Sequence, residues 1–215
     1  MSQLTSIRTW KGGGSMRSLI RRAAVATGAA ALIVGASAGA AAANTATPVS
    51  HLYWANNQAG TIVEANLNGT SAHTIASRQN GPSGVAVDAS NLYWANFNAG
   101  TIVEANLDGT GAKTIASGLF PCGVAVDASH LYFTTEGAVG TPGTIVEANL
   151  DGTGAKTIAS HKGSMFGVAV NASHLYWANH ITSPVGTINE ANLDGTSAKV
   201  IASSQNGPTG VAVGP

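Results

Sequence analysis

After residue 44 the chain alternates short apolar runs with small polar turns, and no window keeps a helical period. Residues 84–88 (Gly-Val-Ala-Val-Asp) form a run of small apolar residues, and residues 91–96 are aromatic and β-prone. Residues 101–109 end in Asp-Gly, which is typical of a hairpin turn into residues 112–116. The pattern predicts an all-β protein with a four-stranded unit, whose strands we name a, b, c and d.

This unit repeats along the chain. Tyr53, Tyr93, Tyr132 and Tyr176 are each followed by Trp or Phe, at spacings of 40, 39 and 44 residues. A period near 40 with four strands indicates the blades of a β-propeller. The repeats begin at strand b, near residue 51, and end at a strand a, residues 210–213. We therefore predict a four-bladed propeller whose ring closes by pairing of the N-terminal and C-terminal strands, which would remove open sheet edges.

The beginning of the chain is predicted to be a signal peptide. Arg17, Arg21 and Arg22 precede an apolar stretch of small residues, 23–43, which ends in Ala-Ala-Ala. A membrane anchor is the alternative for this stretch. We assign residues 1–43 to the signal peptide, with Met16 as a candidate translation start, and residues 44–215 to the propeller domain. This predicts a secreted protein, extracellular or associated with the cell wall, with no membrane contact after cleavage.

Charge and cysteine content narrow the class of partner. After residue 43 the chain holds five Lys and Arg residues against ten Asp and Glu, a net charge of −5. Such a surface offers no basic patch, so we expect no nucleic-acid partner. Cys122 is the single cysteine, so the domain has no internal disulfide and must be stabilised by packing. The histidines show no metal-ligand spacing, and we expect no metal and no cofactor.

Four motifs recur in order: Leu-Tyr-Trp-Ala-Asn, Ile-x-x-Ala-Asn-Leu-Asp-Gly, Lys-Thr-Ile, and Gly-Pro-x-Gly-Val-Ala-Val-Asp. Together they resemble the YWTD repeat of the low-density-lipoprotein-receptor type β-propeller, over residues 50–213. The resemblance extends more loosely to NHL-type and to virginiamycin-B-lyase and gluconolactonase-like propellers. It implies the propeller fold and says little about function. Two features depart from the family, whose members have six repeats and carry Thr-Asp where Ala95-Asn96 stands here.

The loops that differ between repeats locate a candidate binding surface. The a–b and c–d connections barely vary, whereas the d–a connections do, and the b–c connections carry insertions at 136–143 and 180–186. In a blade these variable connections lie at one end, and loops that differ over a constant scaffold are where binding usually sits; drift in unconstrained loops is the alternative. The candidate ligand-binding residues are Arg78, Phe97, Phe120, Lys162, Met165, Phe166 and His180.

Catalysis is the less favoured interpretation. Glu136, His161 and His180 are each unique to their repeat and are the only candidates for an acid–base or metal-binding set. The Glu that recurs on every strand c is expected to be structural. We predict a binding or interaction module for a protein or glycan; a lyase or lactonase and a cell-surface structural protein are the alternatives. We expect a monomer, with two chains sharing an eight-bladed ring as the alternative assembly.

Overall fold

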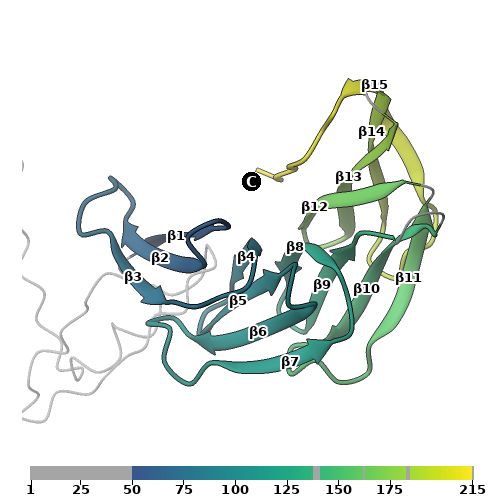
Figure 1. Ribbon diagram of the computed structural model, residues 1–215. Coiled ribbons are helices and arrows are strands. Elements are labelled where there is room, and N and C mark those ends of the chain that lie inside the picture. The colour runs from purple at the N-terminus through teal and green to yellow at the C-terminus, as the bar shows by residue number, and fades with distance from the viewer. Residues whose placement is uncertain (1–49, 138–140, 162, 183–184, 215) are drawn as a thin grey trace, which may run out of the picture. The chain divides into compact units, whose positions relative to one another are not determined.

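The computed structural model describes residues 50–137, 141–161, 163–182 and 185–214, which form fifteen strands and no helix. The predicted signal peptide and Met16 lie outside these residues. The strands form antiparallel sheets that follow one another along an arc, each sheet being one blade (Figure 1). No described helix is long and apolar enough to cross a membrane.

Each blade is one repeat of the sequence. Blade 1 holds β1 (His51–Asn56), β2 (Thr61–Asn66) and β3 (His73–Ala76), in that order across the sheet. The bounds of the other blades are β4 (Pro82–Val87), β5 (Asn91–Asn96), β6 (Thr101–Asn106) and β7 (Lys113–Ser117) in blade 2; β8 (Pro121–Val126), β9 (His130–Thr135), β10 (Gly143–Asn149) and β11 (Lys156–His161) in blade 3; and β12 (Ser164–Val170), β13 (His174–Thr182), β14 (Val185–Asn192) and β15 (Lys199–Asn206) in blade 4. The predicted fold class, an all-β four-bladed propeller, is confirmed.

The hydrophobic core lies between neighbouring blades. Trp94 of blade 2 packs with Ile62 of blade 1, and Phe133 of blade 3 packs with Tyr93 of blade 2. Trp177 of blade 4 packs in the same way with Tyr132 and Ile145 of blade 3. All are at most 3% exposed. Burial of the aromatic positions of strand b explains why they recur in every repeat.

The invariant c–d turns also hold the blades together. The Asp108 carboxylate accepts hydrogen bonds from the Thr110 backbone N–H (3.0 Å) and hydroxyl (2.6 Å). Gly109 follows with φ +80°, and a Cβ there would collide with the Ile75 carbonyl oxygen of the preceding blade. The equivalent glycines, Gly152 and Gly195, lie against Ile115 and Ile158 in the same way.

The predicted pairing of the N-terminal and C-terminal strands is wrong for this structure. Among the described residues β1 pairs with β2 alone in its three-stranded sheet, and residues 208–214 form no strand. The C-terminal segment lies instead against β12, where Gly167 N–H donates to the Thr209 carbonyl at 2.8 Å. Leu52 of β1 is consequently 45% exposed, whereas its equivalent Leu92 is fully buried. Figure 1 shows the gap between β1 and the C-terminal end.

Candidate functional site

A pocket of ≈ 500 Å³ lies where the innermost strands of the blades converge. Its wall is formed by β4, β8 and β12 together with residues 209–211. Small residues make this approach possible: a Cβ on Gly84 would meet Gly123 Cα at 2.9 Å, and a Cβ on Gly167 would meet Gly210 Cα at 2.9 Å. The glycine of the recurring Gly-Val-Ala-Val run therefore allows neighbouring innermost strands to pack closely in the pocket wall.

Two aromatic pairs stand at this pocket. Phe97 and Phe120 lie in variable connections, as predicted, whereas Phe166 and His180 were predicted in connections but lie in β12 and β13. Phe97 and Phe166 line the pocket. The Phe97 ring lies 5.9 Å from that of Phe120, and the Phe166 ring lies 6.1 Å from that of His180. Phe120 is 52% exposed, so it supports Phe97 from the solvent side without lining the pocket. The structure thus brings four of the predicted binding residues together at one place.

Glu136 is the single carboxylate among the described lining residues. Its Oε1 accepts a hydrogen bond from the Ser164 hydroxyl at 3.0 Å, and its backbone N–H donates to the Phe120 carbonyl at 2.8 Å. These two bonds hold the carboxylate between blades 3 and 4. A carboxylate at an aromatic pocket can accept hydrogen bonds from hydroxyl or amino groups of a ligand.

Cys122 also lines the pocket, a placement that the sequence analysis did not predict. Burial, and next the charge of Glu136, raise the pKa of the Cys122 thiol to about 12. The thiol is therefore protonated at neutral pH, and it cannot act as a thiolate nucleophile there.

His161 is occupied by a structural hydrogen bond. Its Nδ1 lies 2.7 Å from the Asn179 amide nitrogen, which is a donor. Gln79 has the same role at the junction between blades 1 and 2, where its Oε1 accepts a hydrogen bond from the Asn96 amide at 2.9 Å. His161 thus links blades 3 and 4, and it does not line the pocket.

His180 lies opposite Ser164 in the β12–β13 pair, outside the pocket lining. The three catalytic candidates therefore do not share the pocket, which only Glu136 reaches. Among the described residues, no group of three His, Cys, Asp or Glu side chains could hold a metal ion.

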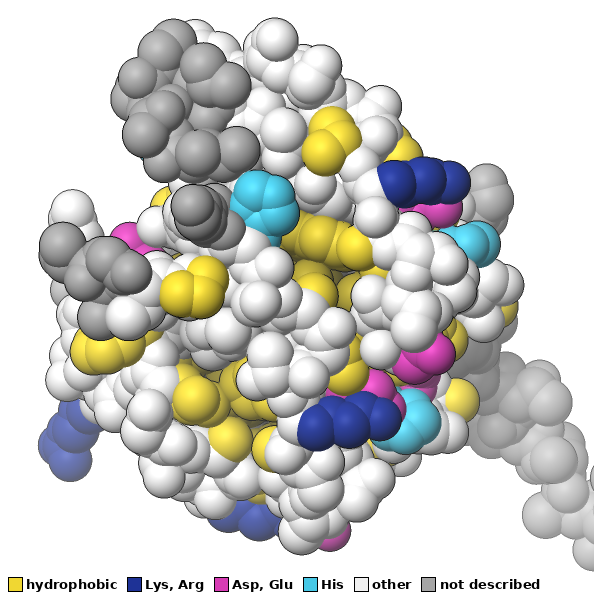
Figure 2. Space-filling model, turned by 90° about the vertical axis from the view of Figure 1, so that its right-hand side faces the viewer, with side chains coloured by type: hydrophobic (Ala, Val, Ile, Leu, Met, Phe, Trp, Pro, Cys, Tyr) yellow, Lys and Arg dark blue, Asp and Glu magenta, His cyan; other side chains and the backbone are white. Residues whose placement is uncertain are grey.

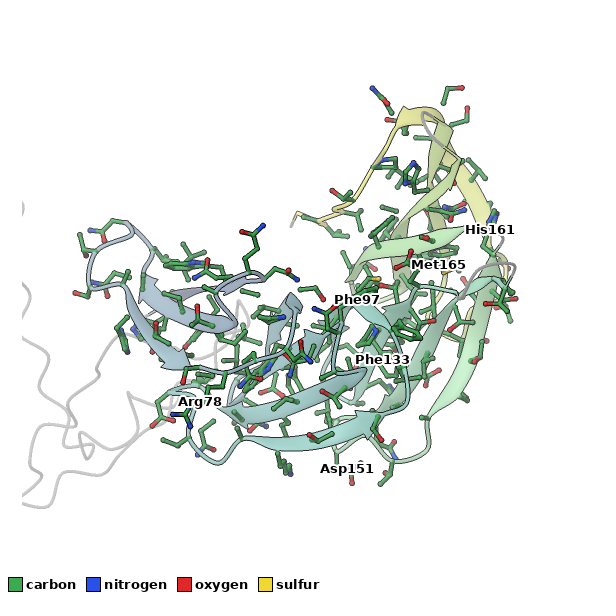
Figure 3. All side chains as sticks on the ribbon, viewed as in Figure 1. Arg78, Phe97, Phe133, Asp151, His161 and Met165 are labelled. Atoms are coloured by element: carbon green, nitrogen blue, oxygen red, sulfur yellow. The ribbon has the colours of Figure 1, made fainter. Side chains whose placement is uncertain are left out.

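Three other predicted binding residues lie elsewhere. Met165 was expected on the variable surface, but it is fully buried in the core between blades 3 and 4, where its apolar side chain packs with Tyr132 and Trp177. Arg78 is exposed next to blade 1, far from Phe97 in Figure 3. Lys162 lies outside the described residues.

The Glu residues of strand c form ion pairs across each sheet. Glu104 and Glu147 pair with Lys113 (3.1 Å) and Lys156 (3.2 Å) of the neighbouring strand d. Glu147 also lies 3.5 Å from His130 of strand b, and Figure 2 shows such clusters of Lys, acidic and His side chains on an otherwise weakly charged face. These contacts explain the recurrence of Glu by cross-strand pairing, in agreement with the structural role expected for it.

No known family model and no curated protein matches this sequence. Solved structures do. A chain of a nidogen/laminin complex is 25% identical, with a TM-score of 0.69 over 77% of this chain and 65% of that chain. A gluconolactonase from Xanthomonas campestris is 19% identical (TM-score 0.64, 76% and 63%), and a protein assigned as TolB from Agrobacterium tumefaciens is 12% identical (TM-score 0.57, 70% and 60%).

These similarities show that the chain is a β-propeller. The chain spans 60–65% of the length of the chains that it matches.

Proposed function

We propose that this protein is an exported binding module of the YWTD type, which holds a protein or glycan ligand at the central pocket. The observation that carries the proposal is the convergence of two aromatic pairs on one pocket. The four linked motifs of each repeat, and the similarity to a chain of a nidogen/laminin complex, support the YWTD assignment. The Ala-rich leader supports export.

The pocket has the make-up of a recognition site. Phe97 and Phe166 offer ring faces, on which a sugar or an apolar side chain can stack. Glu136, held by Ser164, offers an acceptor for hydroxyl or amino groups. Aromatic anchors next to a few placed polar groups are typical of binding hot spots.

The same geometry supports binding over catalysis. Glu136 reaches the pocket without either candidate histidine, and the Cys122 thiol is protonated. His161 is engaged with Asn179 in a blade junction. The likeness to a gluconolactonase, at 19% identity, extends to the fold alone.

The proposal is tested by presenting the purified protein to a glycan array and to the proteins of its own culture medium. We expect a defined glycan or protein to bind, and the double variant Phe97→Ala/Phe166→Ala to bind it at least about tenfold more weakly, since both anchors are lost. Glu136→Gln should weaken the same interaction without removing it.

Arg78→Ala is the matched control, because Arg78 is exposed and lies away from the pocket. Thermal unfolding of each variant distinguishes lost binding from lost folding. A ligand whose affinity is the same for the double variant and the wild type would overturn the proposal.

A further inference from the structure

Gln79 acts as a clamp where the chain passes from blade 1 to blade 2. Its Oε1 accepts hydrogen bonds from Trp94 Nε1 (2.8 Å) and Asn96 Nδ2 (2.9 Å) of β5. Its Nε2 donates to the Ser77 carbonyl at 3.0 Å, which fixes the amide in place. One side chain thus satisfies two buried donors of a strand b, which would otherwise be costly to bury.

Blade 3 lacks both the clamp and the donors that it serves. In blade 3 the positions of Trp94 and Asn96 are taken by Phe133 and Thr135, and the position of Gln79 is taken by Leu119. The backbones are equivalent, since Gln79 N–H donates to Gly60 O and Leu119 N–H donates to Gly100 O. In blades 2 and 3, therefore, a Gln acceptor accompanies Trp and Asn, and an apolar residue accompanies Phe and Thr. In blade 4 His161 meets Asn179, and Trp177 Nε1 has no hydrogen-bond partner among the described residues.

A second clamp of the Gln type lies at the end of blade 4. Residues 203–208 repeat residues 77–82 with a single difference, Ser204 for Arg78. The backbone repeats as well, with φ of 60° at Arg78 and 56° at Ser204. Gln205 Nε2 donates to the Ser203 carbonyl at 2.8 Å, as Gln79 does to Ser77. Within the described part of the chain, no Trp or Asn donates to Gln205 Oε1.

The segment that follows Gln205 already occupies the place of an innermost strand. The Cα of Gly210 lies 2.9 Å from the position that a Cβ on Gly167 would take. The Cα of Gly123 lies at the same distance from the position of a Cβ on Gly84, so residue 210 is placed like the glycine of a strand a. The sequence of this segment, Gly-Val-Ala-Val, equals that of 84–87, 123–126 and 167–170. Blade 4 thus ends in a prepared strand a and a prepared clamp, but no strand b of the described residues pairs with them.

Blade 1 carries the complementary features. β1 carries Trp54 and Asn56, which match the Trp and Asn side chains that donate to Gln79 in blade 2. Its inner edge pairs with no described strand. Trp54 is half-buried, whereas Trp94 is fully buried. At the outer end, Gly69 has φ +78° and open space beside it, where its equivalents contact an Ile of the preceding blade. The matching Ile on blade 4 is Ile201, which is 48% exposed.

We propose that blade 1 of a second copy of this chain docks on blade 4, so that β1 pairs with residues 211–213 and Gln205 clamps Trp54 and Asn56. The register of β4 with β5 sets the pairing as Val211 with Trp54 and Val213 with Leu52. Ile201 of one copy then covers Gly69 of the other. Two such junctions join two copies reciprocally into a ring of eight blades.

A second copy fits better than the chain's own β1. Among the described residues β1 pairs with β2 alone, and Figure 1 shows a gap between it and the C-terminal segment. The junctions therefore turn by less than the angle of about 90° that closure of four blades on themselves requires, whereas a ring of eight requires only about 45°. The same glycine contacts recur at both the inner and outer ends of the junctions, which resists the tightening that closure on itself would need. This assembly differs from the monomer expected from the sequence.

Cysteine cross-linking tests the contact directly. In a Cys122→Ser background, one tagged copy carries Leu52→Cys and a differently tagged copy carries Val213→Cys. Oxidation of the mixture should give a disulfide-linked heterodimer. The proposal is overturned if the mixture gives no linked heterodimer. A double variant, Leu52→Cys/Val213→Cys, then shows whether the two positions meet within one chain or do not meet at all; either result contradicts the proposal.

The clamp is tested by exchanging it for its natural alternative. Gln205→Leu should raise the dissociation constant of the dimer at least about tenfold in analytical ultracentrifugation, because two donors lose their acceptor. Adding Trp54→Phe and Asn56→Thr to Gln205→Leu removes the two donors as well. The triple variant then has the residues that blade 3 carries naturally, Leu119, Phe133 and Thr135, and association should be restored. Gln79→Leu is the control: it should lower the melting temperature while leaving the dimer constant unchanged. Equal dimerisation of wild type and Gln205→Leu, with both proteins folded, would refute the clamp and with it the proposed interface.

Discussion

The Tyr93 hydroxyl donates a 3.0 Å hydrogen bond to Asp88 Oδ2, while Asp88 Oδ1 accepts from the backbone N–H groups of Ser90 and Asn91 at 2.7 Å each. Tyr132 and Asp127 repeat this arrangement in blade 3. One carboxylate thus fixes the a–b turn and anchors the buried ring of strand b. This explains in physical terms why the a–b connection varies so little between repeats.

Removal of the Tyr93 hydroxyl tests this anchor. Tyr93→Phe should lower the free energy of unfolding by about 1–2 kcal/mol, since it loses a hydrogen bond to a charged acceptor. Tyr176→Phe is the matched control, because Asn171 replaces the Asp in blade 4 and its amide is 3.5 Å from the Tyr176 hydroxyl. Urea unfolding should show the smaller loss for Tyr176→Phe; equal losses would contradict a special role for the carboxylate.

Asp127 makes stability depend on acid pH. Burial raises the pKa of this carboxyl, but the hydrogen bonds from Ser129, His130 and Tyr132 outweigh burial, and the pKa lies below its ordinary value of 3.8. The ionised form is therefore favoured in the folded state. Its contribution is complete above the unfolded pKa and is lost as the pH falls through the lower folded pKa.

We therefore expect Asp127→Asn to reduce the loss of melting temperature between pH 5 and pH 2, measured by circular dichroism. Asn is the residue that blade 4 carries naturally at this position, Asn171, so the turn itself should be preserved. The same acid sensitivity in both proteins would show that other carboxyl groups dominate.

The Cys122 thiol should react slowly with alkylating agents. Burial and the Glu136 carboxylate raise its pKa to about 12, so little thiolate forms at pH 8. We expect iodoacetamide to modify the folded protein at least about tenfold more slowly than the urea-unfolded protein, as measured by mass spectrometry. Glu136→Gln should increase the rate in the folded protein, because it removes the second cause of the raised pKa. A rate equal to that of the unfolded chain would contradict the placement of Cys122.

The sequence predicted the blades well because each strand carries its own signal: small residues for strand a, aromatics for strand b and Asp-Gly after strand c. It also predicted that Phe97, Phe120, Phe166 and His180 share one end of the molecule. It could not predict that Met165 points into the core or that His161 replaces Gln79, because both depend on contacts between blades. Ring closure failed for a related reason: complementary ends indicate which strands can pair, but not whether the turn between blades brings them together.

The Asp-Gly turns give a final test of how blades are held together. Gly109 and Gly118 have nearly the same φ, +80° and +79°, so alanine causes similar backbone strain at both, about 1–2 kcal/mol. Their surroundings differ: a Cβ on Gly109 collides with the Ile75 carbonyl of blade 1, whereas a Cβ on Gly118 has nothing within 4 Å. Gly109→Ala should therefore lower the free energy of unfolding by at least about 1 kcal/mol more than Gly118→Ala. Urea unfolding of the two variants measures the difference, and equal losses would show that the junction between blades 1 and 2 yields easily at its outer end.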